Sequence, residues 1–344
     1  MILQAGTAVR TINPAVGDDL CGQLYRRTCG RIRDDLEANL LYLADGRAQV
    51  LLIGLDLLVI DTPDTRAIAA AIEARTGIPA RNVILCCTHT HAGPNTVSIC
   101  HDTPKNTAYV ARLSTTLVDA AAEAVASARP ALIGAACGTA HVGFNRRICW
   151  ADGTHSMYGD STRPDFTGLE GPDDPSHAAL FVRHAPFTED APLAHDFQDL
   201  DIAVRLPSDA ELEQAKKVFR QGEQAAGRWQ YVLQVQGVLN LYETYKDRPI
   251  DTLAVHSLRV GDFALATNPC EFYCQFGLDI KRRSPALVTA IAQLSDGFSG
   301  YCPTIFAILG GGYSGQAIHW CRLEPYAGYR LVDASARLLH AVFK

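Results

Sequence analysis

Blocks of apolar residues recur along the first third of the chain, and their lengths distinguish strands from helices. Residues 38–60 hold two apolar runs around an Asp-Gly pair, which predicts two strands joined by a tight turn. Residues 62–76 carry a helical pattern, with Thr62 as the predicted N-cap. The continuous apolar run NVILCCT at 82–88 predicts a short buried strand.

The alternation continues with an Ala-rich stretch at 109–128, which predicts a long helix, and an apolar stretch at 131–140, which predicts a strand. Strands that alternate with helices build sheets with helices on their faces. We therefore predict an α/β fold with mixed β-sheets covered by helices, a layered hydrolase-like unit and not a Rossmann fold.

The middle of the chain has a different composition. Residues 150–177 are rich in Gly, Pro, Asp and Ser, which predicts an ordered surface loop. A short predicted strand, AALFVRH, follows at 178–184, and residues 208–247 are predicted to be helical. A second α/β segment then comprises a two-stranded hairpin, a helix and a strand, at 252–269, 270–284 and 286–297.

These elements favour one α/β catalytic domain, residues 1–344, made of two intertwined halves. The predicted halves are 1–205 and 206–344, and two separate domains divided near 205 are the alternative.

Composition narrows the class of protein. Hydrophobic residues make up 48% and charged residues 20%, with a net charge of −6, as in soluble globular proteins. The longest basic cluster is KRR at 281–283, so we expect no nucleic-acid partner. No apolar run approaches the length of a transmembrane helix, and the first residues lack the pattern of a secretory signal. The eleven scattered cysteines then indicate reduced thiols and a cytoplasmic protein.

The first candidate chemistry lies directly after the strand predicted at 82–88, in CCTHTHAGPN. Side chains two positions apart on an extended strand point to the same face, so His89 and His91 are predicted to do so. Imidazole is a common zinc ligand, and two on one face would begin a metal site. A polar strand end with two hydrogen-bonded histidines is the alternative interpretation.

Several further motifs accompany this one in a fixed order. The chain resembles the neutral/alkaline (non-lysosomal) ceramidase family, as a bacterial relative with a shortened middle region. The resemblance covers the N-terminal catalytic domain of that family, and the C-terminal immunoglobulin-like module of the longer ceramidases is not expected in this sequence. The motifs that carry the resemblance are TAVRTINPAVG (7–17), VLLIGLDLL (50–58), TGIPARNVILCCTHTHAGPN (76–95), FNRR (144–147) and NPCEFYCQFGLDIKRRSP (268–285).

The resemblance implies a Zn²⁺ ion held by His89, by Glu271 of NPCE and by Tyr301 of SGYCPT. A carboxylate suits zinc, and a tyrosine becomes a ligand when the metal lowers its pKa. Taken from the residues alone, Glu271 is equally well explained as an acid at a helix N-terminus. Tyr301 alone is more simply explained as a turn tyrosine.

The resemblance also implies catalytic residues beside the metal. Tyr313 of GGGYSG, twelve positions after Tyr301, corresponds to a tyrosine that stabilises the oxyanion, aided by Arg146. His91 and Arg146 would face the substrate, and His91 could move protons. An ordinary glycine-loop tyrosine and a surface arginine are the alternatives for Tyr313 and Arg146.

A second zinc histidine is expected in this family, but the segment that carries it is shortened here. His184, at the end of AALFVRH, is the predicted replacement, with His177 and His195 as weaker candidates. Without one, three protein ligands and a water would complete the shell.

Together these observations predict a zinc-dependent hydrolase of an amide (N-acyl) bond, an enzyme acting on C–N bonds other than peptide bonds. The substrate would be a small-molecule or lipid-like N-acyl compound, and not necessarily ceramide. The alternatives are an inactive binding or scaffold subunit and a metal-dependent esterase or lactonase. The helical segment at 208–247 leaves a homo-oligomer open.

Overall fold

A computed structural model describes residues 2–98, 103–184 and 191–344 of the chain. Its largest sheet has six strands in the order β11-β7-β1-β4-β5-β6, and all neighbours are antiparallel except β5 and β6. The strands are β1 (Gln4–Thr11), β4 (Glu37–Ala44), β5 (Gln49–Leu55), β6 (Val83–Cys87), β7 (Arg129–Thr139) and β11 (Ser176–His184).

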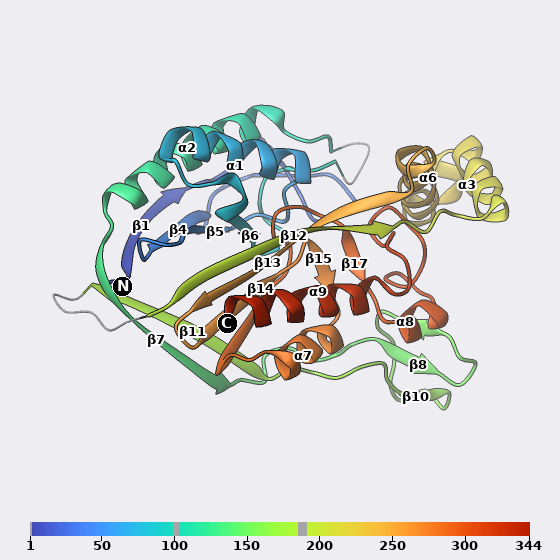
Figure 1. Cartoon of the computed structure of the whole chain (residues 1–344). Helices are drawn as coiled ribbons and strands as arrows, with labels where there is room; N and C mark the ends of the chain where they lie inside the picture. Colours follow the sequence, from blue (N-terminus) through green and yellow to red (C-terminus); the bar gives the residue numbers. More distant parts are fainter. Residues whose placement is uncertain (1, 99–102, 185–190) are drawn as a thin grey trace.

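Two helices cover one face of this sheet, α1 (Thr62–Thr76) and α2 (Thr107–Ala126) (Figure 1). On β5, Leu51 and Ile53 face these helices, whereas Val50 and Leu52 face the opposite side, as the period of two in a strand requires. Helix α1 has the predicted bounds. Its N-cap is Asp61 in extended conformation, one residue before the predicted Thr62.

The second sheet has four strands in the order β12-β13-β14-β16, with β14 and β16 parallel. Its strands are β12 (Leu193–Ala203), β13 (Ile250–Val260), β14 (Phe263–Thr267) and β16 (Val288–Ala292). Two helices, α7 (Cys274–Arg283) and α9 (Ala327–Val342), pack on its outer face around the buried side chains of Phe276 and Leu331.

The inner faces of the two sheets pack on each other. Leu43 and Ile84 of the first sheet share one buried cluster with Leu258 and Val260 of the second. The chain is therefore layered helix, sheet, sheet, helix (Figure 1), and the prediction of an α/β fold with mixed sheets covered by helices is confirmed.

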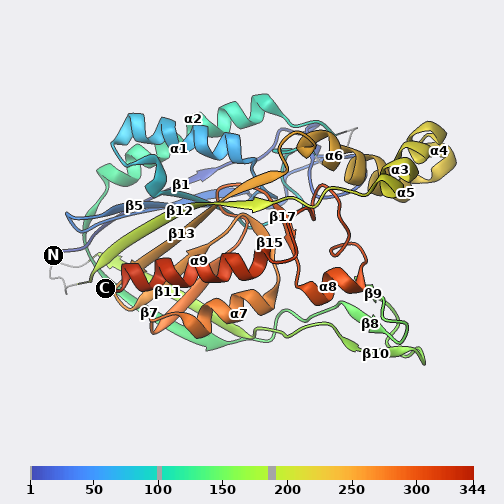
Figure 2. The same ribbon diagram turned by 45° about the vertical axis from the view of Figure 1, so that its right-hand side comes forward.

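Two smaller parts project beyond the sheets on either side of a short parallel pair, β15 (Cys270–Phe272) and β17 (Gly300–Cys302), as both Figure 1 and Figure 2 show. One, the helical arm, spans residues 209–245. It comprises α3 (Asp209–Gln221), α4 (Glu223–Ala226), α5 (Arg228–Tyr231), the π-helix Val232–Leu239 and α6 (Asn240–Tyr245).

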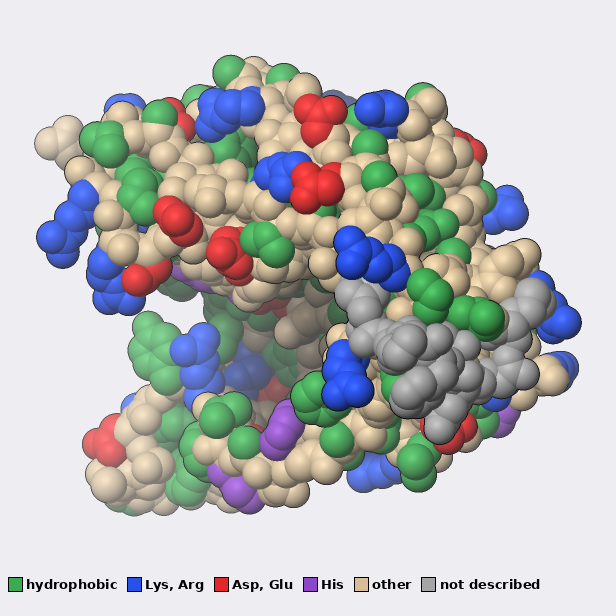
Figure 3. Space-filling model, turned by 90° about the vertical axis from the view of Figure 1, so that its left-hand side faces the viewer, with side chains coloured by type: hydrophobic (Ala, Val, Ile, Leu, Met, Phe, Trp, Pro, Cys, Tyr) green, Lys and Arg blue, Asp and Glu red, His purple; other side chains and the backbone are tan. Residues whose placement is uncertain are grey.

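The other projection, the small lobe, is a three-stranded sheet of β8 (Ile148–Trp150), β9 (His155–Ser156) and β10 (Phe166–Leu169). Residues 150–177 are thus not the predicted loop, because their short strands are too brief to leave an apolar pattern. Seen from the side that carries the N-terminus, the surface is deeply hollowed above a protruding lower part (Figure 3).

Three shorter elements complete the description: the hairpin β2 (Asp19–Leu20) and β3 (Arg27–Thr28), the 3₁₀ turn η1 (Ala80–Asn82) and helix α8 (Ile305–Gly310). The predicted helix at 270–284 begins instead as strand β15 and becomes helical only at Cys274. The cysteines in the described part are all free thiols. None of the helices described there combines the length and apolarity that crossing a bilayer would need.

Candidate functional site

The chain turns sharply where it leaves β6, and this turn positions His89. The amides of Thr88 and His89 donate to the carbonyls of Leu55 and Leu57, so the chain stays bound to the end of β5. His89 adopts a left-handed backbone conformation with φ of 64°. Such a conformation costs on the order of 1–3 kcal/mol in a non-glycine residue, and it persists where a site requires it.

This turn changes the reason why the two histidines lie together. The strand ends at Cys87, so His89 and His91 are not on one face of an extended strand as predicted. Their rings nevertheless meet edge to face, with centroids 4.9 Å apart. Gly22 allows this packing, because a Cβ there would lie 2.6 Å from Cγ of His91, and its φ is +98°.

Glu271 and Tyr301 come from β15 and β17. These parallel strands place the two residues directly opposite each other in register, so their side chains leave the same face. Oε2 of Glu271 lies 3.6 Å from Nε2 of His89. The structure therefore brings together three residues that are far apart in sequence.

The contacts of His89 fit a metal ligand. Its Nδ1 lies 3.0 Å from the carbonyl oxygen of Leu58, which can only accept, so Nδ1 carries the proton and the lone pair of Nε2 faces Glu271. The 3.6 Å between Nε2 and Oε2 is too long for a good hydrogen bond. Two ligands about 2.0–2.2 Å from one tetrahedral zinc would lie roughly 3.3–3.6 Å apart, which matches this spacing.

Electrostatics around the cluster also favour a cation. Burial raises the pKa of the Tyr301 phenol well above its usual range, and the carboxylate of Glu271 raises it further. Burial lowers the pKa of His89, but Glu271 and the Leu58 carbonyl outweigh that effect and the net pKa is raised. Burial and the neighbouring His89 lower the pKa of His91. Within the described residues, no three His, Cys, Asp or Glu side chains are grouped to hold a metal, so a tyrosine would be needed.

Tyr313 stands beside the cluster on the side of the helical arm. Its ring centroid is 5.7 Å from that of Tyr301, 5.8 Å from that of Trp229 and 6.1 Å from that of Trp320. The turn that carries it follows α8, and Gly311 and Gly312 in that turn both have positive φ. Tyr313 is thus held between aromatic rings with its side chain next to a candidate ligand.

Arg146 lies on the other side of the cluster. It lines a cavity of about 460 Å³ together with His89, Glu271 and Tyr301, and Tyr313 does not border that cavity. Both residues nevertheless lie close enough to Tyr301 to affect its pKa, and their joint action on one oxyanion stays a prediction.

Arg147, the residue after Arg146, was missed in the prediction from sequence. Its side chain is buried, with the residue 5% exposed. Its Nε donates to Glu170 at 2.7 Å, its Nη1 to the hydroxyl of Ser314 at 2.9 Å and its Nη2 to the carbonyl of Gly311 at 2.9 Å. His155 contacts the same Glu170 oxygen at 2.6 Å. This network connects the small lobe to the turn that carries Tyr313. The pair of adjacent arginines in FNRR was the only signal in the sequence.

The structure does not bring the predicted second histidine to the cluster. Backbone pairing places His184 opposite Ala131, and β11 and β6 form the two outer edges of the six-stranded sheet. Figures 1 and 2 show β11 leading to the end of the molecule opposite β15 and β17. His177, in the same strand, pairs with Gly138 of β7.

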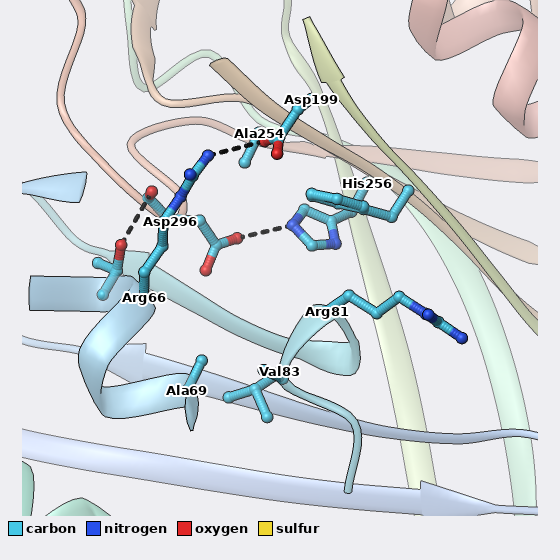
Figure 4. Close-up of a pocket in the computed structure, with 11 residues that line it drawn as sticks. Arg66, Ala69, Arg81, Val83, Asp199, Ala254, His256 and Asp296 are labelled. Carbon is cyan, nitrogen blue, oxygen red and sulfur yellow. Dashed lines mark hydrogen bonds and ion pairs between the residues drawn. The ribbon is translucent and has the colours of Figure 1, made fainter. Parts of the chain in front are cut away.

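His195 belongs to a different buried group. Its Nε2 lies 3.0 Å from Nδ1 of His256, and Nε2 of His256 lies 3.2 Å from Oδ2 of Asp296. Figure 4 shows His256 and Asp296 in a cavity of about 240 Å³ beside the ion pair of Arg66 with Asp199. This cavity lies between α1 and strands β12 and β13, and His89 and Glu271 do not line it.

Strain is concentrated around the cluster. Among the described residues, the non-glycine residues with positive φ are His89, Leu294 and Asp296. The carbonyl of Leu294 accepts from the Cys87 amide, and the Asp296 amide donates to Leu85. The segment 294–296 therefore pairs with the end of β6 and supports the turn that carries His89.

The fold of this chain is shared with two solved ceramidase structures. One solved structure with this fold is the neutral ceramidase from Pseudomonas aeruginosa, with a TM-score of 0.71 and 13% sequence identity over 99% of this chain and 74% of that one. Another is a ceramidase complexed with C2, with a TM-score of 0.65 and 14% identity over 100% and 75% of the two chains.

The chain matches no protein-family model and no curated protein sequence. At these low identities the comparison establishes a shared fold. The resemblance to neutral ceramidases predicted from the sequence is confirmed at that level.

Proposed function

We propose that the protein is a metal-dependent hydrolase of amide (N-acyl) bonds, with zinc held by His89, Glu271 and Tyr301. The observation that carries the proposal is the 3.6 Å between Nε2 of His89 and Oε2 of Glu271, with Nδ1 of His89 fixed by Leu58. The ceramidase fold of two solved structures supports the same reaction class. His184 has no place in this proposal, because β11 ends far from the cluster.

In this proposal Tyr313 and His91, beside the metal, each assist a different step of amide hydrolysis. Zinc, when bound, supplies Lewis acidity toward a water and a carbonyl oxygen. Tyr313 is placed to donate a hydrogen bond to the oxygen that becomes negative as water adds to the carbonyl. His91, in contact with His89, is placed to carry a proton to the amine as the C–N bond breaks. The hydroxyl of water remains on the acyl group, which leaves as a carboxylic acid.

Metal content tests the ligand assignment without depending on a substrate. Protein purified without an affinity tag should contain about one equivalent of zinc by mass spectrometry. His89→Ala and Glu271→Ala should each reduce the content to well below about half an equivalent, because two protein ligands hold zinc poorly. His340→Ala, an exposed histidine on α9, is the matched control and should retain the metal.

Turnover tests the reaction class. The zinc-loaded protein should hydrolyse members of a panel of N-acyl amides, and His89→Ala should not. Absence of zinc in the unaltered protein, or hydrolysis of esters and lactones with no amide hydrolysed, would overturn the proposal.

A further inference from the structure

The candidate cluster stands between two compartments of unequal size. His89, Glu271 and Tyr301 border both a cavity of about 460 Å³ and one of about 80 Å³. An amide at the cluster would thus place its acyl part on one side and its amine part on the other. The walls of each compartment then limit which amide fits.

The smaller compartment is lined in part by apolar side chains. Leu24, Phe298 and Trp320 line it beside Tyr313, and the same side chains pack against the helical arm in one cluster. Arg228 of the arm donates to the backbone carbonyl of Leu24 at 2.7 Å, which fixes the arm to the wall of this compartment. About 80 Å³ holds a short acyl group such as acetyl or propanoyl and is too small for a fatty-acid chain.

The larger compartment has an exposed arginine on its wall, Arg146, and Glu271 of the candidate cluster lines the same cavity. Arg146 is exposed to this cavity and makes no hydrogen bond or ion pair with any residue that the structure describes. In its neighbour Arg147, each of the three guanidinium nitrogens donates a hydrogen bond within the buried network described above. Asp173 accepts a hydrogen bond from the backbone amide of Asn145, the residue before Arg146. A guanidinium left open in a cleft favours a carboxylate or phosphate of a ligand.

We propose that the substrate is a small amide with a short acyl group and an amine part that bears a carboxylate or phosphate. This inference rests on the proposed amide hydrolysis and specifies its substrate. The acyl group occupies the compartment of Leu24 and Trp320, and Arg146 binds the anionic group in the other. Phe144 and Met157, which line the larger compartment, offer apolar contacts to the rest of the amine.

Matched substrates test both halves of this assignment. An N-acetyl amino acid should be hydrolysed with kcat/KM at least about 100-fold above that of the same amino acid bearing a hexadecanoyl chain. The kcat/KM of the N-acetyl amino acid should also be about 10- to 100-fold above that of the N-acetyl amine that lacks the carboxylate. This ratio is the usual contribution of a charge-assisted hydrogen bond. An N-acetylated aminoalkyl phosphate distinguishes a phosphate site from a carboxylate site.

Variants locate the two effects in the fold. Arg146→Met should lower kcat/KM for the anionic substrate about 10- to 100-fold more than it lowers kcat/KM for the neutral substrate. Arg146→Lys should recover part of the loss, and Arg33→Met, at an exposed arginine paired with Asp34, should have no effect. Leu24→Ala should extend the acyl chains accepted by a few carbons, since Leu24 lines the smaller compartment.

Calorimetric binding of N-acetyl amino acids separates this inference from the proposed reaction. Binding that Arg146→Met weakens at least about 10-fold, with no amide hydrolysed, would support the anion site and overturn the reaction. Hydrolysis that favours long acyl chains, or that ignores the anionic group, would overturn this inference and leave the reaction standing. If the protein neither binds nor hydrolyses these compounds, both the proposed reaction and this inference are overturned.

Discussion

At the scale of single residues, the site depends on a backbone conformation that side-chain patterns do not reveal. The backbone of His89 is in the left-handed conformation. Its ring is held by the carbonyl oxygen of Leu58, which lies just after the end of β5. The HxH spacing in the sequence pointed to His89, but that interpretation assumed an extended chain. The two rings meet because the chain turns back, and Gly22 leaves room for that.

Tyr313 offers a sharp test at this scale. Tyr313→Phe removes the hydroxyl and retains the ring that packs against Tyr301 and Trp320. If the hydroxyl stabilises the oxyanion, kcat should fall about 100- to 1000-fold, the loss typical of one oxyanion donor. Zinc content should not change, because Tyr313 is not a proposed ligand. Tyr326→Phe, at an exposed tyrosine before α9, is the control, and an unchanged kcat in Tyr313→Phe would exclude the role.

At the scale of elements, the small lobe and the tyrosine turn are joined by one buried ion pair. The Arg147 and Glu170 side chains are 6% and 3% exposed, and they link β8 and the residues after β10 to Gly311 and Ser314. His155 of β9 packs so closely on Gly310 of α8 that a Cβ there would lie 2.1 Å from Cγ of His155. The lobe therefore acts as a support for Tyr313 rather than a separate appendage.

Removing Arg147 should destabilise this junction strongly. Arg147→Met removes the guanidinium from the buried Glu170 carboxylate, which keeps its contact with His155, and this should cost about 3–5 kcal/mol in the free energy of unfolding. The matched control is Arg163→Met in the same lobe, where the pair with Asp165 is 55% and 41% exposed. Because that pair is exposed to solvent, the substitution should cost far less than Arg147→Met. Urea unfolding measures both, and equal losses would contradict the supporting role of Arg147.

At the scale of the whole molecule, sequence patterns predicted the layers but not their contacts. The strands at 38–60 and 82–88 and the helices at 62–76 and 109–128 were recognisable because a buried face imposes a regular apolar period. Strand β12, which lies before residue 205, pairs with β13, which lies after it. The division at 205 itself stays a prediction.

The site was predictable only in part, for a related reason. Glu271 and Tyr301 could be proposed because they occur in short turn motifs, and motifs are local. Their register across β15 and β17, the Arg147 network and the position of His184 depend on pairings between distant segments. Strands of two to four residues, such as β9 and β10, leave no periodic signal at all. For this reason the small lobe was predicted as a loop.

Buried histidines give the whole fold a dependence on pH that can be measured. Burial lowers the pKa of His195 to about 3, and burial together with Arg322 lowers the pKa of His319 to about 3. Both are neutral when folded, whereas an unfolded histidine takes up a proton near pH 6.5. The unfolded state then binds more protons than the folded state below pH 6.5, so stability must fall as the pH decreases.

The loss should approach about 1.4 kcal/mol per pH unit for each histidine below about pH 6. Urea unfolding at pH 7.5, 6.5, 5.5 and 5.0 measures this slope. His319→Phe keeps an aromatic ring facing Tyr245 but cannot take up a proton, so its curve should be less steep by about one histidine's share. The Nδ1 atom of His319 is buried without a hydrogen bond, so the substitution removes no such bond at that atom. A slope that His319→Phe leaves unchanged would show that this ring is not held neutral by the fold.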